Sequence, residues 1–496
     1  MSPPPRKVLL TSVCRPFGEA VGDADSVGYE LLFCQVTRAQ GAFSPRSHHI
    51  HFSLEYLAEN LDCPAVTLQY PSRRELVREL RRGYDVVGVS FVLATYHRMK
   101  ETVALIRKHA PEAEIVLGGY GTVLDDAMLT PYGDHICREE GVAYLRKLLG
   151  QPPLQKPYRH PLISNPLRIF GQEISRTGIV IAGLGCPHAC DFCCTSHFFK
   201  RKHIRLLPTG RDIYRVVKRY LDRDADSAIL IIDEDFLMNR KRAMEFRDCV
   251  QEGGVPLGVF AFASVRAISQ YTVTEILEMG IDGLWIGYEG ARSGYAKQQG
   301  RPVGEIFREF RDHGISILAS MIVGLPYQTP EIIQEELDGL LDLRPDFGQF
   351  LIYGPTPGTP FFDRVLRENL MHPEFAGDKE LYCRKASGFY AMVQHPTMQP
   401  AEIEGWQRRC FEEDYRRLGA GIYRAVDTML LGYLKLKDSP SAFFRAKAAS
   451  LARMVRKAYP AFLPGKLLGP SERARAAVAD LERRAHEALG APTVWE

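Results

Sequence analysis

The stretch Thr177-Gly-Ile-Val-Ile-Ala-Gly-Leu-Gly-Cys186-Pro-His-Ala-Cys190-Asp-Phe-Cys193 joins a β-rich run to three closely spaced cysteines. Three thiolates at this spacing can hold three irons of a four-iron, four-sulfur cluster and leave the fourth iron without a protein ligand. A four-cysteine site is coordinatively closed, whereas a three-cysteine site can bind something other than protein. The sequence therefore predicts a cluster with one open position at these three cysteines.

Zinc and disulfide bonds are the alternatives for closely spaced cysteines. Structural zinc usually takes two pairs of ligands, and no second pair follows within about thirty residues. His188, His197 and His203 lie nearby but lack the spacing of a two-cysteine, two-histidine site. The chain has 11 cysteines in 496 residues, and we expect no secretory leader, so a disulfide framework is disfavoured. For Cys194, a small buried side chain is the better interpretation.

The pattern Cys-x3-Cys-x2-Cys, with an aromatic residue before the last cysteine, resembles the signature of the radical S-adenosylmethionine enzymes. In that family a reduced cluster cleaves S-adenosylmethionine to a 5′-deoxyadenosyl radical, and the protein orients the reactants. The resemblance implies that Cys186, Cys190 and Cys193 ligate the cluster. It also implies that Phe192 lies against the adenine of S-adenosylmethionine.

Strand-like and helical segments alternate around and after the cysteines, which is typical of βαβ units and a parallel sheet. Six such units would make an incomplete (β/α) barrel, whose ligands lie at the carboxyl ends of the strands. The expected strands are 177–182, 228–232, 257–263, 284–286, 315–323 and 349–352, and the expected helices include 212–222, 240–251 and 272–279.

Acidic residues follow two of the expected strands. Asp233, Glu234 and Asp235 come directly after the second strand, where the resemblance implies binding of the methionyl ammonium. A solvated turn is the alternative, because acidic runs at strand ends are common. Glu289 lies in Gly-Tyr-Glu-Gly at the end of the fourth strand, which is similar to the family's Gly-x-Glu-Ser segment near the cofactor ribose.

Two further positions are candidates for cofactor binding. Gly324 and Pro326 end the fifth strand in Gly-Leu-Pro, which is similar to the family's adenine-contact segment, although such a triplet alone also fits a turn. Arg266, after the third strand, could pair with the cofactor carboxylate, and a surface arginine is an equal alternative.

The first 150 residues form a separate doubly wound α/β unit, with the apolar run 85–92 as a strand buried on both faces. This unit resembles the cobalamin-binding domain of B12-dependent radical enzymes. The matching places are Gly118, Gly119 and Tyr120, and the closing segment 138–141. The glycines would let the backbone approach a bulky ligand. The Asp-x-His-x-x-Gly motif of many cobalamin proteins is absent, and a domain of this shape that binds only substrate remains the alternative.

The segment from Cys14 to His49 is longer than the usual first loop of such a domain, and segments of this length are functional or disordered. His48, His49 and His51 are candidates for a cobalt or substrate contact, with solvated loop histidines as the alternative.

Composition changes along the chain predict its divisions. Five prolines in or near 151–168 predict an extended linker, residues 169–392 the radical module, and residues 393–496 a helical unit. Residues 421–470 carry nine lysines and arginines against two aspartates, with interleaved aromatic residues. A solvated basic face is one interpretation, and peripheral contact with an anionic membrane or an amphiphilic substrate is the other.

The whole-chain properties limit the class of protein. The net charge of +3 is too small for a dedicated polyanion binder, so no nucleic-acid partner is expected. No apolar run approaches the length of a membrane span. Free cysteines and an oxygen-sensitive cluster predict a reducing cytoplasm, with membrane association through the basic region as an additional expectation.

The sequence thus predicts an enzyme with a four-iron, four-sulfur cluster, S-adenosylmethionine and cobalamin, supplied by an electron donor such as flavodoxin or ferredoxin. The favoured reaction is methylation of an unactivated carbon in a small or lipid-like molecule. Cyclisation or rearrangement of a hydrophobic substrate is the first alternative. A methylthiotransferase, whose second cluster would need cysteines such as Cys14, Cys34 and Cys63, is the next. A non-catalytic cobalamin or cluster sensor is the last.

Overall fold

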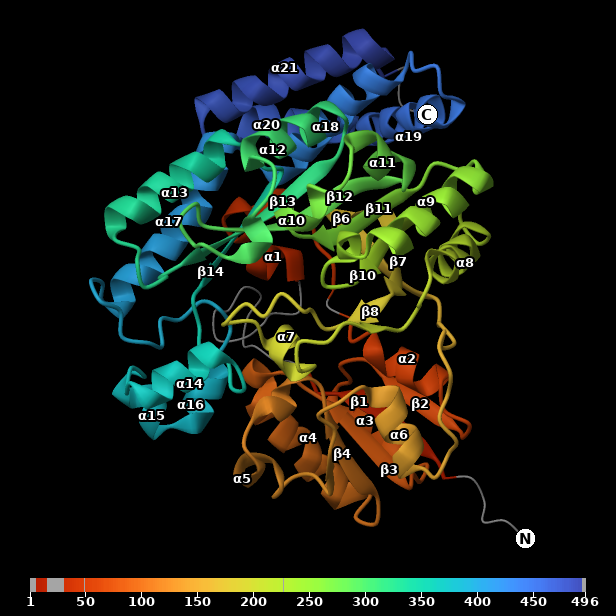
Figure 1. Cartoon of the computed structure of the whole chain (residues 1–496), viewed down its shortest axis with the longest axis vertical. Coiled ribbons are helices and arrows are strands. Elements are labelled where there is room, and N and C mark those ends of the chain that lie inside the picture. The colour runs from red at the N-terminus through yellow and green to blue at the C-terminus, as the bar shows by residue number, and fades with distance from the viewer. Residues whose placement is uncertain (1–5, 16–30, 49, 226, 493–496) are drawn as a thin grey trace.

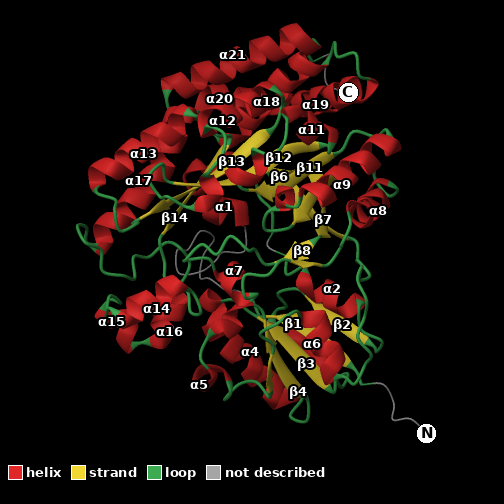
Figure 2. Ribbon diagram, viewed as in Figure 1, coloured by secondary structure: helices red, strands yellow, loops and turns green. Residues whose placement is uncertain are grey.

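The computed structural model describes residues 6–15, 31–48, 50–225 and 227–492 (Figure 1). A parallel sheet with flanking helices lies at one end, a larger curved sheet lies in the middle, and a layer of helices covers the other end (Figures 1 and 2). The predicted α/β class is confirmed.

Five parallel strands form the N-terminal sheet in the order β2-β1-β3-β4-β5. The apolar strand β3 is nearly continuous in sequence because helices cover both faces of the sheet. This order is that of doubly wound folds, which bind ligands at the carboxyl edge of the sheet. The strands are β1 (Val8–Ser12), β2 (Ala65–Leu68), β3 (Val86–Ser90), β4 (Glu114–Gly118) and β5 (His135–Ile136). The helices are α2 (Ser53–Glu59), α3 (Arg73–Leu80), α4 (Tyr96–His109), α5 (Asp126–Leu129) and α6 (Gly141–Leu148).

The central sheet has seven strands in the order β14-β13-β12-β11-β10-β7-β6, and it forms the predicted partial barrel. All neighbouring pairs are parallel except β6 and β7. The strands are β6 (Ile163–Ile169), β7 (Gln172–Ile181), β10 (Ala228–Ile232), β11 (Gly258–Ala263), β12 (Ile281–Glu289), β13 (Ser316–Val323) and β14 (Phe347–Ile352).

The expectation of an extended linker over 151–168 is wrong at its C-terminal end. Residues 163–168 belong to β6, which pairs antiparallel with β7. Pro166 made the segment read as a connector, yet β6 is the edge strand of the sheet, where a proline is tolerated. The other predicted boundaries between units stay predictions.

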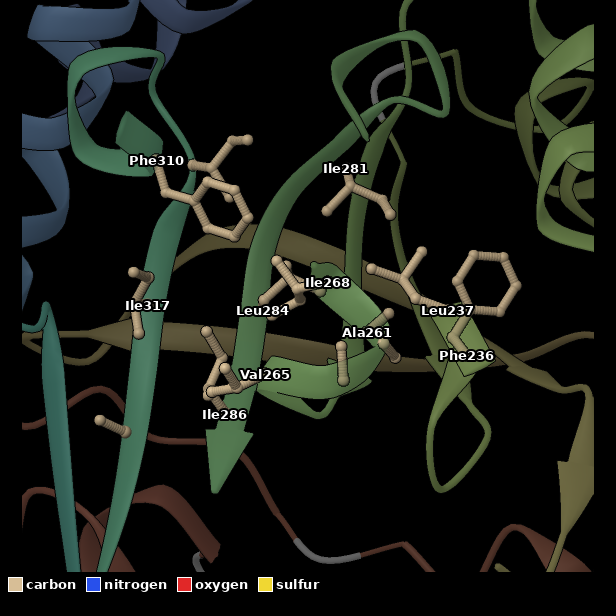
Figure 3. Packing of buried hydrophobic residues seen from close by; sticks show 14 of the residues in the cluster. Phe236, Leu237, Ala261, Val265, Ile268, Ile281, Leu284, Ile286, Phe310 and Ile317 are labelled. Carbon is tan, nitrogen blue, oxygen red and sulfur yellow. The ribbon is translucent and has the colours of Figure 1, made fainter. Parts of the chain in front are cut away.

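Helices cover the outer face of the central sheet and bury one continuous apolar core with it. In Figure 3, Leu284 and Ile286 of β12 lie beside Ile268 and Val265 of the covering segments, and Ile281 lies toward the other end of the strand. The helices are α8 (Gly210–Leu221), α9 (Arg240–Gly253), α10 (Val265–Ile268), α11 (Val273–Glu278), α12 (Val303–Asp312) and α13 (Pro330–Asp342). Capping boxes begin α8 and α11, as their Thr-x-x-Asp and Thr-x-x-Glu sequences favour.

Three short helices after β14 join the central sheet to the N-terminal unit. The helix α16 packs against α4, where Lys100 and Glu380 form an ion pair. Phe375 and Tyr382 share an apolar cluster with Leu76 and Met99 of the N-terminal unit. These helices are α14 (Pro360–Arg367), α15 (Pro373–Gly377) and α16 (Lys379–Lys385).

The C-terminal helices pack over the amino ends of the barrel strands, and we call α18 to α21 the helical cap. No helix among the described residues is both long enough and apolar enough to cross a bilayer. The helices are α17 (Pro400–Leu418), α18 (Gly421–Leu436), α19 (Ala442–Lys457), α20 (Tyr459–Leu468) and α21 (Glu472–Leu489).

The described part of the long loop after β1 crosses from the N-terminal unit to the barrel and cap. It contains α1 (Leu31–Gln35) and a 3-10 helix (Arg38–Phe43). The Gly421 N–H donates to Gln40 Oε1 over 2.9 Å, and the Phe43 ring packs edge-on against Tyr423. Residues 31–46, the strap, therefore pack as part of the fold, while His49 of the predicted histidine group lies outside the described residues.

Candidate functional site

The three predicted cysteines lie on the loop that follows β7 and ends in the short helix α7 (Cys194–Phe198). Figure 1 shows α7 between the central sheet and the N-terminal sheet. The loop begins at Gly185, whose φ of 76° and close approach to Lys202 O exclude a larger side chain. The Cys193 N–H then donates to Cys190 O over 3.1 Å, which closes the loop.

The three thiols lie close enough to influence one another. Burial raises the pKa of Cys186 to about 12 and of Cys190 to about 11, and the neighbouring Cys193 adds to both shifts. The Lys297 ammonium opposes the shifts at Cys190 and Cys193. Within the described ranges, no three Cys, His, Asp or Glu side chains form a single-ion site. Three soft thiolate donors beside a fixed cation fit an iron–sulfur cluster, in which each thiolate binds a different iron.

Asp191, inside the cysteine motif, ties the loop to the ends of two barrel strands. The Tyr295 hydroxyl donates to Asp191 Oδ1 over 3.0 Å, and the Tyr353 hydroxyl donates to Oδ2 over 2.7 Å. The Phe361 N–H donates to the Asp191 carbonyl. Asp191 was not among the predicted site residues. Its position between two predicted cluster ligands could have indicated a role in holding the loop.

Phe192 lies in an aromatic group beside the cysteines. Its ring packs edge-on against Tyr295 and Tyr353, with centroids 5.4 and 6.0 Å away. The Lys297 ammonium lies 5.7 Å from the Phe192 centroid. The ring is half-buried, so part of its surface stays accessible to a ligand.

The three acids after β10 have different roles in the structure, because Asp233 and Asp235 are buried and already paired. Arg242 donates to Asp233 Oδ2 over 2.6 Å, and His203 lies 3.1 Å from Oδ1. Although burial opposes ionisation, His203 and Arg242 hold the pKa of Asp233 below its ordinary value.

Asp235 holds the cysteine loop through His188. The His188 Nε2 lies 2.7 Å from Asp235 Oδ2, and the Ser264 hydroxyl donates to the same oxygen over 2.6 Å. The other oxygen, Oδ1, is buried without a hydrogen-bond partner among the described residues. Asp235 therefore positions the loop and retains one acceptor atom at the base of the site.

Glu234 is the member of the acidic run whose side chain is exposed. Its negative charge raises the pKa of Cys186, Cys193 and Tyr120. Desolvation by the surrounding protein and the charge of Asp233 raise the pKa of Glu234 to about 7. Of the three predicted ammonium ligands, Glu234 is thus the one available to a ligand.

Glu289 is buried at the end of β12 and forms an ion pair with Lys297. Its backbone φ of 57° is unusual for a residue other than glycine and turns its side chain toward Lys297. Burial opposes the charge of Lys297, but Glu289 and the nearby cysteines hold the pKa of Lys297 above its ordinary value. Lys297 was missed in the sequence, since a lysine eight residues beyond a strand carries no recognisable signal.

In the predicted adenine-contact segment, two backbone N–H groups are already hydrogen-bonded within the protein. The N–H groups of Gly324 and Leu325 both donate to Gln328 Oε1, over 2.7 and 2.9 Å. Pro326 is exposed. Arg266 lies on α10, is exposed, and makes no ion pair with the described residues. The geometry therefore does not single out Pro326 or Arg266 as ligands.

The glycine segment after β4 faces the cysteine loop. Gly119 has a φ of 84°, and a Cβ atom there would lie 2.6 Å from Phe91 O, so this position requires glycine. At Gly118 a Cβ would meet open space. The Tyr120 ring packs edge-on against Phe198 of α7, with centroids 5.3 Å apart. The ligand-binding edge of the N-terminal sheet thus lies beside the thiols.

Other residues predicted around this edge make hydrogen bonds within the protein. Arg138 donates to Thr122 O and Leu124 O and holds the segment after Tyr120 in place. His51 lies 3.0 Å from the Ser53 hydroxyl at the start of α2.

No family model matches the chain. An "uncharacterized methyltransferase" of Pyrococcus horikoshii is 25% identical over 336 residues, which are 58% of this chain and 70% of the relative. An anaerobic magnesium-protoporphyrin IX monomethyl ester cyclase of Cereibacter sphaeroides is 23% identical over 357 residues, which are 60% of this chain and 56% of the relative. The chain therefore spans between about half and 70% of the length of these curated relatives.

A solved structure matches nearly the whole chain. The radical S-adenosylmethionine methyltransferase TsrM from Kitasatospora setae superposes with a TM-score of 0.60 at 14% identity, over 92% of this chain and 99% of that protein. That protein was solved with tryptophan and an S-adenosylmethionine analogue, and also with cobalamin and an iron–sulfur cluster. At this identity the likeness shows that the two chains share a fold.

Proposed function

We propose that the chain is a radical S-adenosylmethionine enzyme with an N-terminal cobalamin-binding domain, and that it methylates an unactivated carbon of a small molecule. The observation that carries this proposal is the contact between Tyr120 and α7. That contact brings the ligand edge of the N-terminal sheet to the cysteine loop, as transfer of a group between two cofactors requires.

Cys186, Cys190 and Cys193 would hold the cluster, and the segment from Gly118 to Tyr120 would face the cobalamin. When bound, the cluster with S-adenosylmethionine supplies one-electron cleavage of a sulfonium, and cobalamin supplies a methyl carrier. The open space at Gly118 supports close approach of a bulky ligand to the backbone. The hydrogen-bond acceptors and charges around these cofactors would come from side chains of the protein.

Glu234 would accept hydrogen bonds from the methionyl ammonium, because it is the accessible carboxyl group beside two of the thiols. The half-buried ring of Phe192 offers a flat apolar surface for the adenine. Glu289 reaches a ligand only through its pairing with Lys297, so we assign it a positioning role. Asp191 and Asp235 orient the loop and do not touch the ligands in this proposal.

Lys297 would stabilise negative charge at the cluster. Its ammonium lowers the pKa of Cys190 and Cys193, so it favours the thiolate forms that ligate iron. A low-potential donor such as flavodoxin or ferredoxin would supply the electron. Contact of the basic C-terminal region with an anionic membrane remains part of the proposal as an additional property of the protein.

The test is anaerobic purification from cells supplied with hydroxocobalamin, followed by iron analysis and a visible spectrum. We expect about four irons per chain, corrin bands in stoichiometric amount, and formation of 5′-deoxyadenosine from S-adenosylmethionine after reduction. Cys186→Ser, Cys190→Ser and Cys193→Ser should each lose the cluster and this activity, while the half-exposed Cys63→Ser should retain both.

Three outcomes would contradict the proposal. Absence of corrin would exclude the proposed cobalamin-dependent methylation, and about eight irons per chain would favour a methylthiotransferase. A reconstituted cluster that forms no 5′-deoxyadenosine would favour the non-catalytic sensor.

A further inference from the structure

A second cavity lies at the opposite end of the barrel from the cysteine loop, and we call it the cap cavity. It has a volume of about 260 Å³ and lies among the strap, the start of β14 and the helices α18, α20 and α21. Its lining includes six arginines: Arg311, Arg344, Arg417, Arg424, Arg473 and Arg484.

Three of these arginines are neutralised by carboxylates. Arg424 makes two bonds to Asp414, of 2.7 and 2.8 Å. Arg484 donates to Asp427 over 2.7 Å and also to Asp480. Arg417 forms an ion pair with Asp338. The pairing is internal to the protein and leaves little positive charge for a ligand at these positions.

The other three arginines have no carboxylate partner among the described residues. Arg311 donates only to the Leu343 carbonyl, over 3.3 Å, while Arg344 and Arg473 are exposed and make no ion pair. Asp346 also lines the cavity, but it accepts bonds from Ile317 N–H and the Thr428 hydroxyl, and burial raises its pKa to about 6. Three arginines without a carboxylate partner among the described residues therefore line the same cavity.

The rest of the lining restricts what can enter. Phe43 of the strap, Tyr423 of α18 and Leu481 of α21 supply apolar wall. The Tyr423 hydroxyl is engaged with Ala461 O, so the ring and not the hydroxyl faces a ligand. The volume is just below the range of pockets that enclose drug-sized ligands. It suits a phosphate or diphosphate group with a small apolar part.

We propose that the cap cavity binds the phosphate group of a phosphorylated ligand through Arg311, Arg344 and Arg473. Guanidinium groups bind phosphate oxygens in paired, charge-assisted hydrogen bonds, which matches this donor set. The cavity lies outside the cluster and cobalamin site, so the proposal stands or falls independently of the reaction proposed above.

Two sources can supply such a group: a soluble phosphorylated metabolite or the headgroup of an anionic lipid. The helix α20, whose Gly465 lines the cavity, exposes Leu463, Leu467 and Leu468 by 58, 66 and 68%. Exposed leucines on a cavity-forming helix make the lipid source worth a separate arm of the experiment.

The first arm titrates the full-length holoenzyme with inorganic pyrophosphate and measures binding by calorimetry. We expect the charge-reversed double variant Arg344→Glu/Arg473→Glu to bind at least about tenfold more weakly, which corresponds to roughly 1.4 kcal/mol. The matched control is Arg74→Glu/Arg223→Glu, which reverses two other exposed arginines without ion pairs and should bind like the wild type.

The second arm measures flotation of the protein with phosphatidylcholine vesicles that contain or lack phosphatidic acid. Flotation that needs phosphatidic acid, and that pyrophosphate releases, identifies a lipid headgroup. Pyrophosphate binding without flotation identifies a soluble ligand.

The proposal is overturned if neither probe binds, or if pyrophosphate binds both double variants equally. It is also overturned if flotation survives Arg344→Glu/Arg473→Glu but is lost in Leu467→Asp/Leu468→Asp. Leu366→Asp, at another exposed leucine, on α14, controls for the loss of a surface leucine.

Discussion

The two ends of the barrel strands use buried charges for different purposes. At the amino ends, the partners come from the helical cap: Lys447 of α19 reaches Asp282 and two backbone carbonyls, and Arg424 of α18 pairs with Asp414 and contacts Pro345 O. At the carboxyl ends, the partners come from the loops and helices of the barrel itself, as in the pair of Asp233 with Arg242 of α9.

The difference shows which charges are free to act. The paired charges of Lys447 and Arg424 fasten the cap to the barrel. Lys447 and Asp414 are buried, and Arg424 and Asp282 are half-buried. The carboxyl-end charges fasten the cysteine loop, and they leave Glu234 and the thiols accessible beside the N-terminal sheet. Substitutions of these paired charges at the first end should therefore change stability alone, whereas substitutions at the second should change the cofactors that are bound.

The largest expected effect is at Lys447, which is buried and donates to Leu257 O, Gly280 O and Asp282 Oδ2. Lys447→Met leaves two carbonyls and a carboxylate without their donor, so the free energy of unfolding should fall by about 3 to 5 kcal/mol. Urea denaturation measures the change, and the iron content of the folded protein should not change.

Lys457→Met is the matched control on the same helix, because Lys457 is exposed and should cost well under about 1 kcal/mol. A Lys447→Met protein that is as stable as the wild type, or that is stable but loses iron, would break the distinction between the two ends.

The next effect concerns His160, beside the carboxyl end of β7. The imidazole is buried and accepts a hydrogen bond at Nε2 from the Ile181 N–H over 2.8 Å. Burial lowers the pKa of His160 to about 4. The folded protein keeps this group neutral while the unfolded chain takes up a proton below about pH 6.5, so stability is lost as the pH falls from 6.5 toward 4.

His160→Gln removes the titration and offers an amide oxygen to the Ile181 N–H. The loss of stability between pH 6.5 and 4 should be smaller in the variant than in the wild type by roughly 3 kcal/mol. Denaturation midpoints across this range measure it. Parallel pH profiles for the two proteins would show that the buried imidazole is not the titrating group.

A smaller effect is expected at Asp191, which sharpens the comparison because it links loop geometry to cluster retention. Asp191→Asn weakens two hydrogen bonds from tyrosine hydroxyls to a charged acceptor, at a cost of roughly 2 kcal/mol. We expect faster loss of iron to a chelator after reconstitution. Tyr295→Phe removes one of the two bonds and should show about half of the effect, and unchanged iron loss in both would refute the positioning role.

The sequence predicted the strands of the barrel well because most of them are short apolar runs followed closely by glycine, proline or an acidic residue. It failed at β6, because Pro166 hides an edge strand whose partner is known only once the sheet is formed. The spacing of the three cysteines predicts that they share one loop, and their role as cluster ligands stays a prediction. Lys297 and Tyr295 were not, since the loop that carries them approaches the thiols only through the fold of β12.

The acidic run shows the limit most clearly. Sequence treats Asp233, Glu234 and Asp235 alike, whereas alternation along the chain turns the first and third inward and the second outward. Asp233 pairs with Arg242, nine residues away in sequence, and Asp235 contacts His188, forty-seven residues away. A local sequence pattern can indicate the pairing of Asp233 with Arg242, but not the pairing of Asp235 with the distant His188.

The smallest predicted effect tests this division directly. Glu234→Gln keeps the shape of the side chain but removes the charge that would meet the methionyl ammonium. Binding of S-adenosylmethionine should weaken about tenfold, or roughly 1.4 kcal/mol, while the denaturation midpoint stays near that of the wild type because Glu234 makes no ion pair among the described residues.

Asp235→Asn is the paired variant, with the opposite expectation. It disturbs the bonds to His188 and Ser264, so the protein should lose stability and retain less iron. Equilibrium dialysis with labelled S-adenosylmethionine, at equal cluster occupancy, separates the two cases. If Asp235→Asn weakens binding at full occupancy and Glu234→Gln does not, the inward carboxylate is the ligand, and the carboxyl end of the barrel does not separate structural from binding charges.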